Sequence, residues 1–177
     1  MIQEVSKEVV ELFSASGKTI FTAESCTAGL ICASAANVDG ASKVLLGGII
    51  AYDNIIKTSI LGVPEKILQQ DGAVSFSCAQ SMAENALKKY MAYYGISVTG
   101  IAGPTGGTPE KPIGTVFIGI VDQKKGCLYK CLFTGGRNII REKTVSTVFK
   151  LLIAWEKNKD ISSNLCEVQE IKSFILL

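Results

Sequence analysis

Short apolar runs of the kind that form buried strands alternate along this chain of 177 residues with segments of helical periodicity. The strand-like runs cover residues 19–23, 44–52, 96–101, 115–121 and 128–133. The helical segments cover residues 3–16, 28–36, 53–61, 64–70 and 75–90, and a last one has apolar residues between positions 145 and 153. This alternation predicts an α/β domain with a mostly parallel sheet and an antiparallel hairpin near its end.

The run at residues 44–52 is almost entirely apolar, so we expect a central strand that is buried on both faces. Tyr52 lies at its carboxyl end and Lys57 follows five residues later. Ligands of open α/β sheets collect beyond the carboxyl ends of strands, which makes both residues candidates for lining a cleft. The alternative for Lys57 is an exposed helix lysine, and the residue type alone favours that alternative.

We expect one domain over residues 1–155, followed by a tail over residues 156–177 that docks on the surface or stays loose. The first residues have neither the basic start nor the apolar stretch of a signal peptide, and no apolar run approaches the roughly 18 residues of a membrane span. The six cysteines form no CxxC pair. We therefore interpret them as reduced, mostly buried thiols of a cytoplasmic protein.

The chain contains no histidine. This excludes Ser-His-Asp and Cys-His catalysis within the chain, together with imidazole ligands for a metal. Lysine, tyrosine and the carboxylates remain as residues that can move a proton. A formal net charge of only +2 disfavours direct binding of nucleic acid.

Arginine occurs only at positions 137 and 141, whereas the other 16 basic residues are lysines. The planar guanidinium fork binds a carboxylate or a phosphate in a way that an ammonium group cannot. Two interpretations of Arg137 stand about even: an anion-binding residue, or an ordinary exposed residue at a helix start. For Arg141 the ordinary exposed role is favoured.

Ser25 follows a predicted strand and precedes a predicted helix, where free backbone amides and the positive end of a helix dipole meet. Such a junction can hold an anion or an oxyanion, although a serine there is usually a helix cap. Cys26 is a competing nucleophile, but without a histidine to activate it a small buried thiol is the better interpretation.

Residues 100–114 combine glycines at positions 100, 103, 106 and 107 with three of the four prolines of the chain. Successive amides in such a loop can bind a phosphate. The loop matches neither the Walker A pattern nor GxGxxG, so a nucleoside triphosphate or dinucleotide site is not indicated. The alternative is a loop that only connects two elements.

Taken together, these segments resemble the CinA C-terminal domain family, whose stand-alone members include nicotinamide-nucleotide amidases. The resemblance covers about residues 3–155. It is carried by TAESCTAG at 22–29, GGIIAY at 47–52 with Asn54 and Lys57, LGVP at 61–64, GAVS at 72–75, VTGIAGP at 98–104, GGTPEKPIGTV at 106–116 and Gly136-Arg137. The longer CinA proteins also carry an N-terminal molybdopterin-binding-like domain.

The resemblance implies a three-layer α/β/α sandwich on a five-stranded mixed sheet. It also implies deamidation of nicotinamide mononucleotide to nicotinate mononucleotide and ammonia, with no cofactor and no metal. Ser25 corresponds to the nucleophile and Lys57 to its base, with Tyr52 assisting; a serine–lysine pair is a known variant of the triad. The substrate-binding residues implied are Glu24, Thr27, Ala28, Gly29, Gly48, Gly103, Thr105, Gly106 and Arg137.

Within this interpretation, backbone amides near residues 27–29 hold the oxyanion, while Arg137 and the loop at 103–108 hold the phosphate. Ala28 stands where the family pattern has glycine, and it is the one departure that bears on activity. The alternative function is a nucleotide-binding regulatory protein without turnover, linked to competence or DNA repair. We expect a small nucleotide as the partner, with no nucleic acid and no membrane, and the sequence leaves homo-oligomerisation open.

Overall fold

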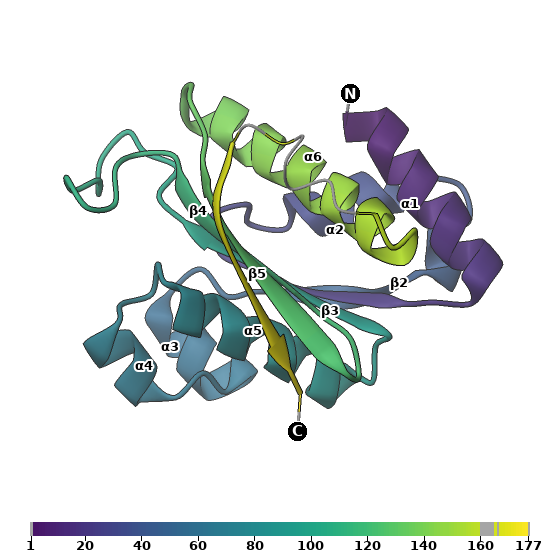
Figure 1. Ribbon diagram of the computed structural model, residues 1–177, viewed down its shortest axis with the longest axis horizontal. Coiled ribbons are helices and arrows are strands. Elements are labelled where there is room, and N and C mark those ends of the chain that lie inside the picture. The colour runs from purple at the N-terminus through teal and green to yellow at the C-terminus, as the bar shows by residue number, and fades with distance from the viewer. Residues whose placement is uncertain (1, 160–164, 166, 177) are drawn as a thin grey trace.

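A computed structural model describes residues 2–159, 165 and 167–176, and shows a mixed sheet between two layers of helices (Figure 1). The described strands form one six-stranded sheet in the order β2-β1-β3-β4-β5-β6. Their bounds are β1 Ile20–Glu24, β2 Leu45–Ile50, β3 Tyr94–Gly100, β4 Thr115–Val121, β5 Lys125–Leu132 and β6 Val168–Ile175. Strand β1 is parallel to both β2 and β3, whereas the other three pairings are antiparallel.

The helices cover both faces of this sheet (Figure 1). One layer contains α1 (Ile2–Ser16), α2 (Leu30–Ala36) and α6 (Arg137–Glu156), with the short 3-10 helix η1 (Ala41–Lys43) close by. The other layer contains α5 (Phe76–Tyr90), α4 (Glu65–Gln70), α3 (Asn54–Ile56) and the π-helical turn η2 (Lys57–Leu61). Ser75 caps α5 by accepting a hydrogen bond from the Cys78 amide, as its position before the helix predicts.

The predicted α/β class and the mixed sheet are confirmed, with two differences. The sheet has six described strands instead of five, and antiparallel pairings outnumber parallel ones. The prediction of a central strand at residues 44–52 is wrong, because β2 lies at an edge and its residues alternate between partly buried and exposed. Leu46 and Ile50 are half-exposed. Apolar composition reports the hydrophobicity of a strand, but it does not report the number of neighbours that the strand has.

The tail contributes the sixth strand. Strand β6 pairs with β5 from Lys125↔Ile175 to Cys131↔Val168, so residues 168–175 dock onto the sheet. The five described cysteines are free thiols; four of them are buried and Cys32 is partly buried. Cys166 lies outside the described residues. No helix in the described part of the chain combines the length and apolar character that a membrane span requires.

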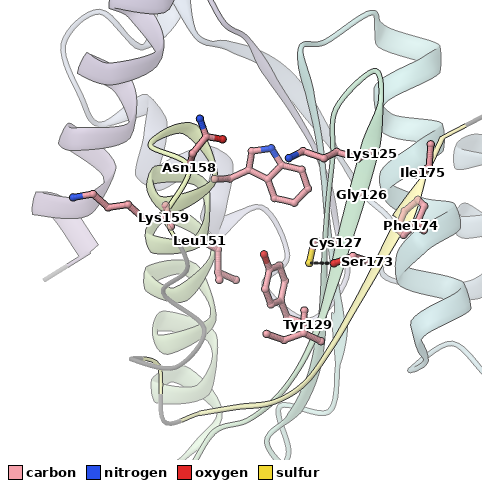
Figure 2. Close-up of a pocket in the computed structure, with 13 residues that line it drawn as sticks. Lys125, Gly126, Cys127, Tyr129, Leu151, Asn158, Lys159, Ser173, Phe174 and Ile175 are labelled. Atoms are coloured by element: carbon pink, nitrogen blue, oxygen red, sulfur yellow. Dashed lines mark hydrogen bonds between the residues drawn. The ribbon is translucent and has the colours of Figure 1, made fainter.

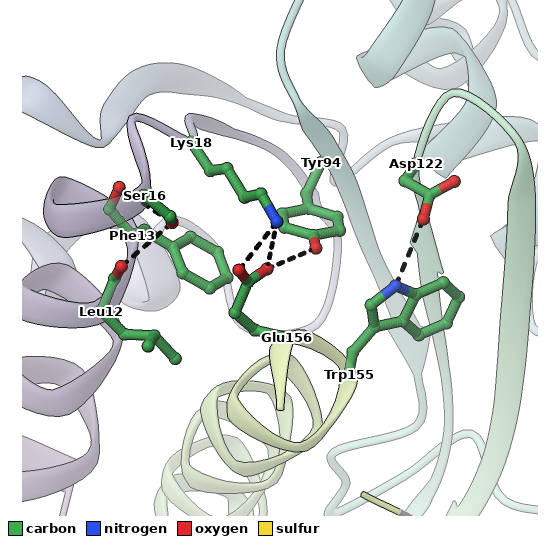
Figure 3. A network of polar contacts seen from close by, with 8 residues as sticks. All are labelled: Leu12, Phe13, Ser16, Lys18, Tyr94, Asp122, Trp155 and Glu156. Carbon is green, nitrogen blue, oxygen red and sulfur yellow. Dashed lines mark hydrogen bonds and ion pairs between the residues drawn. The ribbon is translucent and has the colours of Figure 1, made fainter. Parts of the chain in front are cut away.

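A polar cluster joins helix α6 to the amino end of the parallel strands (Figure 3). Lys18 Nζ donates to both oxygens of Glu156, at 2.7 and 2.8 Å, and the hydroxyl of Tyr94 donates to the same carboxylate at 2.8 Å. Glu156 ends α6, Lys18 precedes β1 and Tyr94 begins β3. One carboxylate therefore connects three segments that are far apart in the sequence.

Candidate functional site

A cavity of about 320 Å³ lies at the carboxyl ends of β1 and β3, next to the segment that follows β2. It contains seven of the residues that the sequence singled out: Ser25, Tyr52, Lys57, Gly103, Thr105, Gly106 and Arg137. Asn54, Thr99 and Ile101 also line it. The strand-end rule thus placed the cavity correctly, although β2 is an edge strand.

Lys57 is the most unusual residue of this cavity, because its side chain is only 2% exposed. Asp53 caps the first turn after β2 by accepting from the Ile55 amide, and Lys57 opens the π-helical turn that follows. A π-helical turn widens a helix by one residue and is frequent at functional sites. The exposed helix lysine that residue type favoured is therefore ruled out.

The hydrogen bonds of Lys57 suit a neutral amine. Its Nζ donates to the carbonyl of Ala51 at 2.8 Å and to that of Tyr52 at 3.0 Å. A neutral amine has two hydrogens, which these carbonyls accept, and a lone pair that remains to take up a proton. Burial lowers the pKa of Lys57, and no carboxylate among the described residues forms an ion pair with it.

Ser25 and Cys26 follow β1 directly and both line the cavity. The Ser25 amide donates to the Val98 carbonyl of β3, and its carbonyl accepts from the Ala28 amide, so its backbone is held on two sides. Burial raises the pKa of the Cys26 thiol to about 12. A thiol with this pKa is protonated at neutral pH and is a poor nucleophile, which favours Ser25 over Cys26.

Glu24 lies behind the cavity, outside its lining. Its buried carboxylate accepts from the Thr27 hydroxyl at 2.7 Å and from the amides of Ile31 and Cys32 at 3.1 and 3.0 Å. These are first-turn amides of α2, so an internal carboxylate already occupies the helix start. Glu24 and Thr27 therefore shape the turn that carries Ser25, and the geometry gives neither side chain a direct contact with a ligand in this cavity.

Three further residues implied by the resemblance also lie outside the lining: Ala28, Gly29 and Gly48. Gly48 is needed for packing, because a Cβ there would lie 2.2 Å from Thr22 Oγ1 and 2.6 Å from Cys32 Sγ. Ala28 has a φ of 50° and Gly29 a φ of 89°, both left-handed. Glycine adopts this conformation without penalty, whereas alanine does so with strain of about 1–2 kcal/mol. The left-handed backbone at position 28 therefore explains why the family pattern has glycine there, where this chain has alanine.

Arg137 joins two sides of the cavity. Its guanidinium donates to the Gly103 carbonyl at 2.8 Å and to the Tyr52 hydroxyl at 2.6 Å. The residue opens α6 and is exposed, with further N–H donors beyond these two bonds. Arg137 therefore lies where a bound anion would contact both the start of α6 and the glycine-rich loop at 103–108.

Sequence reasoning missed Arg141 and Thr99. The exposed role favoured for Arg141 is wrong, because its Nη2 donates to the Thr27 carbonyl at 2.8 Å and its buried Nε has no hydrogen-bond partner among the described residues. Thr99 lines the cavity near the end of β3, and its hydroxyl donates to the Ala73 carbonyl. The available signal for Thr99 was its place near a strand end, and for Arg141 it was the restriction of arginine to positions 137 and 141.

A larger cavity, about 640 Å³, lies elsewhere (Figure 2). It is a groove between the end of α6 and strands β5 and β6, lined by Tyr129, Leu151, Trp155 and the two lysines 125 and 159. None of the predicted site residues borders this groove. Volume alone therefore does not identify the chemical site of this protein.

The fold and the smaller cavity define a class of protein: an α/β/α sandwich with a polar cavity at its parallel strand ends, lined by a serine and a buried lysine. Within this class, the chain belongs to the CinA C-terminal domain family, whose model matches residues 2–155. A competence/damage inducible protein, CihA from Agrobacterium tumefaciens, is 37% identical, with a TM-score of 0.84 over 86% of this chain and 94% of that one.

A CinA superfamily protein from Klebsiella pneumoniae is 26% identical, with a TM-score of 0.85 over 89% of this chain and 99% of that one. Among curated sequences, a CinA-like protein from Thermotoga maritima is 42% identical over 89% of this chain and 38% of its own length. A CinA-like protein from Dictyoglomus turgidum is 50% identical over 81% of this chain and 35% of its own length. The chain thus spans little more than a third of the curated relatives that it matches.

Proposed function

We propose that this chain is an amidohydrolase that converts nicotinamide mononucleotide and water to nicotinate mononucleotide and ammonia, with Ser25 as nucleophile and Lys57 as base. The observation that carries the proposal is the buried amine of Lys57 in the cavity that Ser25 also lines. A lysine must lose its proton to act as a base, and burial with no ion pair to a carboxylate of the described residues favours that loss.

In the proposed reaction, the Ser25 hydroxyl attacks the carboxamide carbon while Lys57 Nζ accepts the hydroxyl proton. The two carbonyls of Ala51 and Tyr52 orient the amine, which then returns the proton to the leaving nitrogen as ammonia departs. Water attacks the resulting acyl-serine, and the carboxylate product leaves with Ser25 restored. We assign the oxyanion to the backbone amides of Thr27 and Gly29 in the turn at 27–29, because the Ala28 amide already donates to the Ser25 carbonyl.

The phosphate of the substrate is assigned to Arg137 and the loop at 103–108. Gly103, Thr105 and Gly106 line the cavity from the loop side, and Arg137 donates to the Gly103 carbonyl. A guanidinium with donors left over can bind a phosphate through two parallel hydrogen bonds. The Tyr52 hydroxyl accepts a hydrogen bond from the same guanidinium. Tyr52, which we propose assists Lys57, is therefore linked directly to the proposed phosphate site.

A second candidate is a nucleotide-binding regulatory protein without turnover. The observation that favours it is the left-handed conformation of Ala28, which places a strained residue in the turn after Ser25. Binding of the mononucleotide without any release of ammonia supports this candidate over the amidase.

The deciding experiment incubates the purified chain with nicotinamide mononucleotide and measures ammonia and nicotinate mononucleotide together. We expect both products in equal amounts, and a loss of at least about 10⁴-fold in turnover for Ser25→Ala. The matched control is Cys26→Ala, which removes the neighbouring polar atom and should leave most of the turnover. Loss of activity in well-folded Cys26→Ala with retention in Ser25→Ala would reverse the assignment.

A further inference from the structure

Strand β6 ends the described sheet, and one of its edges pairs with no other described strand. Its inner edge pairs with β5, but no strand in the described part of the chain pairs with its outer edge. Figure 1 shows this edge facing the viewer, with no element of the described chain in front of it. The strand is eight residues long, and Ile171 and Ile175 are 40% and 79% exposed. A long, partly apolar edge of this kind is a template for pairing with another strand.

The hydrogen bonds to β5 establish which backbone groups face outward. The Leu176 amide donates to the Lys124 carbonyl, in register with the pair Lys125↔Ile175. In an antiparallel pair, residues that bond to the neighbour alternate with residues that do not. Over residues 170–175 the even-numbered residues therefore bond to β5, while the amides and carbonyls of Ile171 and Ser173 point to the open edge.

The charges of β6 are complementary to those of a second, antiparallel copy of the same strand. Glu170 and Lys172 flank Ile171, and their side chains lie on the same face, 3.5 Å apart between Lys172 Nζ and Glu170 Oε1. If a second strand of the same sequence runs antiparallel and is centred on Ile171, each Glu170 lies directly opposite a Lys172. These two positions form non-hydrogen-bonded pairs, in which Cα atoms approach to about 4.5 Å and side chains interact most closely.

We propose that this protein forms a symmetric dimer through antiparallel pairing of β6 with β6 of a second copy, centred on Ile171. The pairing joins two sheets into one continuous sheet across a two-fold axis. Each Ile171 then covers the exposed Ile171 of the second copy, on the face that borders the groove of Figure 2. On the opposite face, two Glu170 and two Lys172 form an alternating ring of four charges.

Other registers of the β6–β6 pairing have less favourable overlap or less favourable cross-strand charges. A ladder centred on Lys172 overlaps equally well, but it sets the two Lys172 ammonium groups against each other. Ladders centred two residues away, on Gln169 or Ser173, are shorter and remove both opposite-charge pairs. Like charges directly opposite each other destabilise a strand pair, so charge selects the register centred on Ile171.

The test measures the molar mass of the full chain by sedimentation over a range of concentrations. Lys172→Glu sets Glu against Glu in both cross-strand pairs, and Glu170→Lys sets Lys against Lys. Each variant alone should dimerise at least about tenfold more weakly than the unmodified chain. An equimolar mixture of the two variants restores both Glu–Lys pairs and should form a heterodimer. Lys7→Glu on α1, which makes the same charge change and also loses an ion pair with a nearby glutamate, should leave dimerisation unchanged.

A second variant tests the backbone ladder. Ile171→Pro removes an amide that points outward, so the pairing with β5 is kept, and the variant should be monomeric with an unchanged far-ultraviolet spectrum. A monomeric unmodified chain at every concentration overturns the proposal. It is equally overturned if the chain dimerises and neither the charge variants nor Ile171→Pro weakens the dimer, because the interface then lies on another face.

Discussion

Lys18 and Lys57 lie at opposite ends of the parallel strands and have opposite surroundings. Lys18 precedes β1 and binds the Glu156 carboxylate, with 21% of its side chain exposed. Lys57 follows β2 and is buried against two carbonyls, and none of the described carboxylates is bonded to its amine. Hydrogen bonding to Glu156 raises the pKa of Lys18, whereas burial lowers the pKa of Lys57.

The difference teaches how the fold treats a cation that is partly or fully removed from water. At the amino end of the strands, a charge meets its counter-charge, and the pair stabilises the junction of three segments (Figure 3). At the carboxyl end, no carboxylate in the described part of the chain forms an ion pair with Lys57, and its desolvation opposes folding while it favours the neutral amine. The same residue type thus stabilises one end of the sheet and has a lowered pKa at the other.

The largest expected effect concerns Lys57 itself. Lys57→Arg keeps the charge but stays protonated, so turnover of nicotinamide mononucleotide should fall about 10²–10⁴-fold, as far as in Lys57→Ala. The measurement is ammonia release from well-folded protein, and Lys66→Arg on the exposed helix α4 serves as the matched control. Near-normal turnover in Lys57→Arg would make Lys57 an electrostatic or structural residue, and Tyr52 would then be examined as the proton acceptor.

The next effect concerns Arg137, the cation of the cavity that has no counterpart at the Lys18 end. Arg137→Lys keeps the charge but loses the planar fork, so affinity for the mononucleotide should fall about ten- to a hundredfold. Calorimetric binding to the Ser25→Ala variant separates affinity from turnover. The phosphate-free riboside is the control ligand, and equal losses for both ligands would mean that Arg137 does not contact the phosphate.

A smaller effect is expected at the other end of the sheet. Glu156→Gln removes the charged acceptor of Lys18 and Tyr94, and should lower the free energy of unfolding by about 1.5–3 kcal/mol without changing turnover. Glu8→Gln is the control, because Glu8 binds Lys157 at the same 2.7 Å but on the surface, where such pairs contribute about 0–1 kcal/mol. Equal losses in the two variants in urea unfolding would show that burial does not distinguish the two ion pairs.

The smallest effect is the pH dependence of stability, for which the two lysines have opposite signs. Between the lowered pKa of Lys57 and the ordinary lysine value of about 10.4, the unfolded chain binds the Lys57 proton more tightly, so stability should rise with pH across this window. The contribution of Lys18 is fully present below about 10.4 and is lost as pH rises through its raised pKa.

Lys57→Met isolates the first of these contributions. The variant should be at least as stable as the unmodified chain at neutral pH, because methionine fills a similar volume without a buried amine. Its stability should also lack the rise with pH. A difference between the two proteins that does not change with pH would contradict a lowered pKa at Lys57.

The sequence by itself determined the elements and most of the cavity. Helical periodicity located the helices, and short apolar runs located five of the six described strands, because burial leaves a local pattern of apolar residues. Segment order then brought Ser25, Lys57 and Arg137 to one cavity, since parallel strands end at the same edge of a sheet. The absence of histidine narrowed the candidate bases before any geometry was available.

Only the tertiary structure decided which strands are edges and which charges have partners. Strand β2 is as apolar as a central strand, and β6 is too weakly patterned to be recognised, because the number of neighbours of a strand is a property of the whole sheet. Lys18 and Lys57 are likewise the same residue type in the sequence. Glu156 lies 138 positions from Lys18, and only folding brings a carboxylate to Lys18 while no described carboxylate forms an ion pair with Lys57. Electrostatic energies depend on distance and desolvation, and neither quantity is local in the chain.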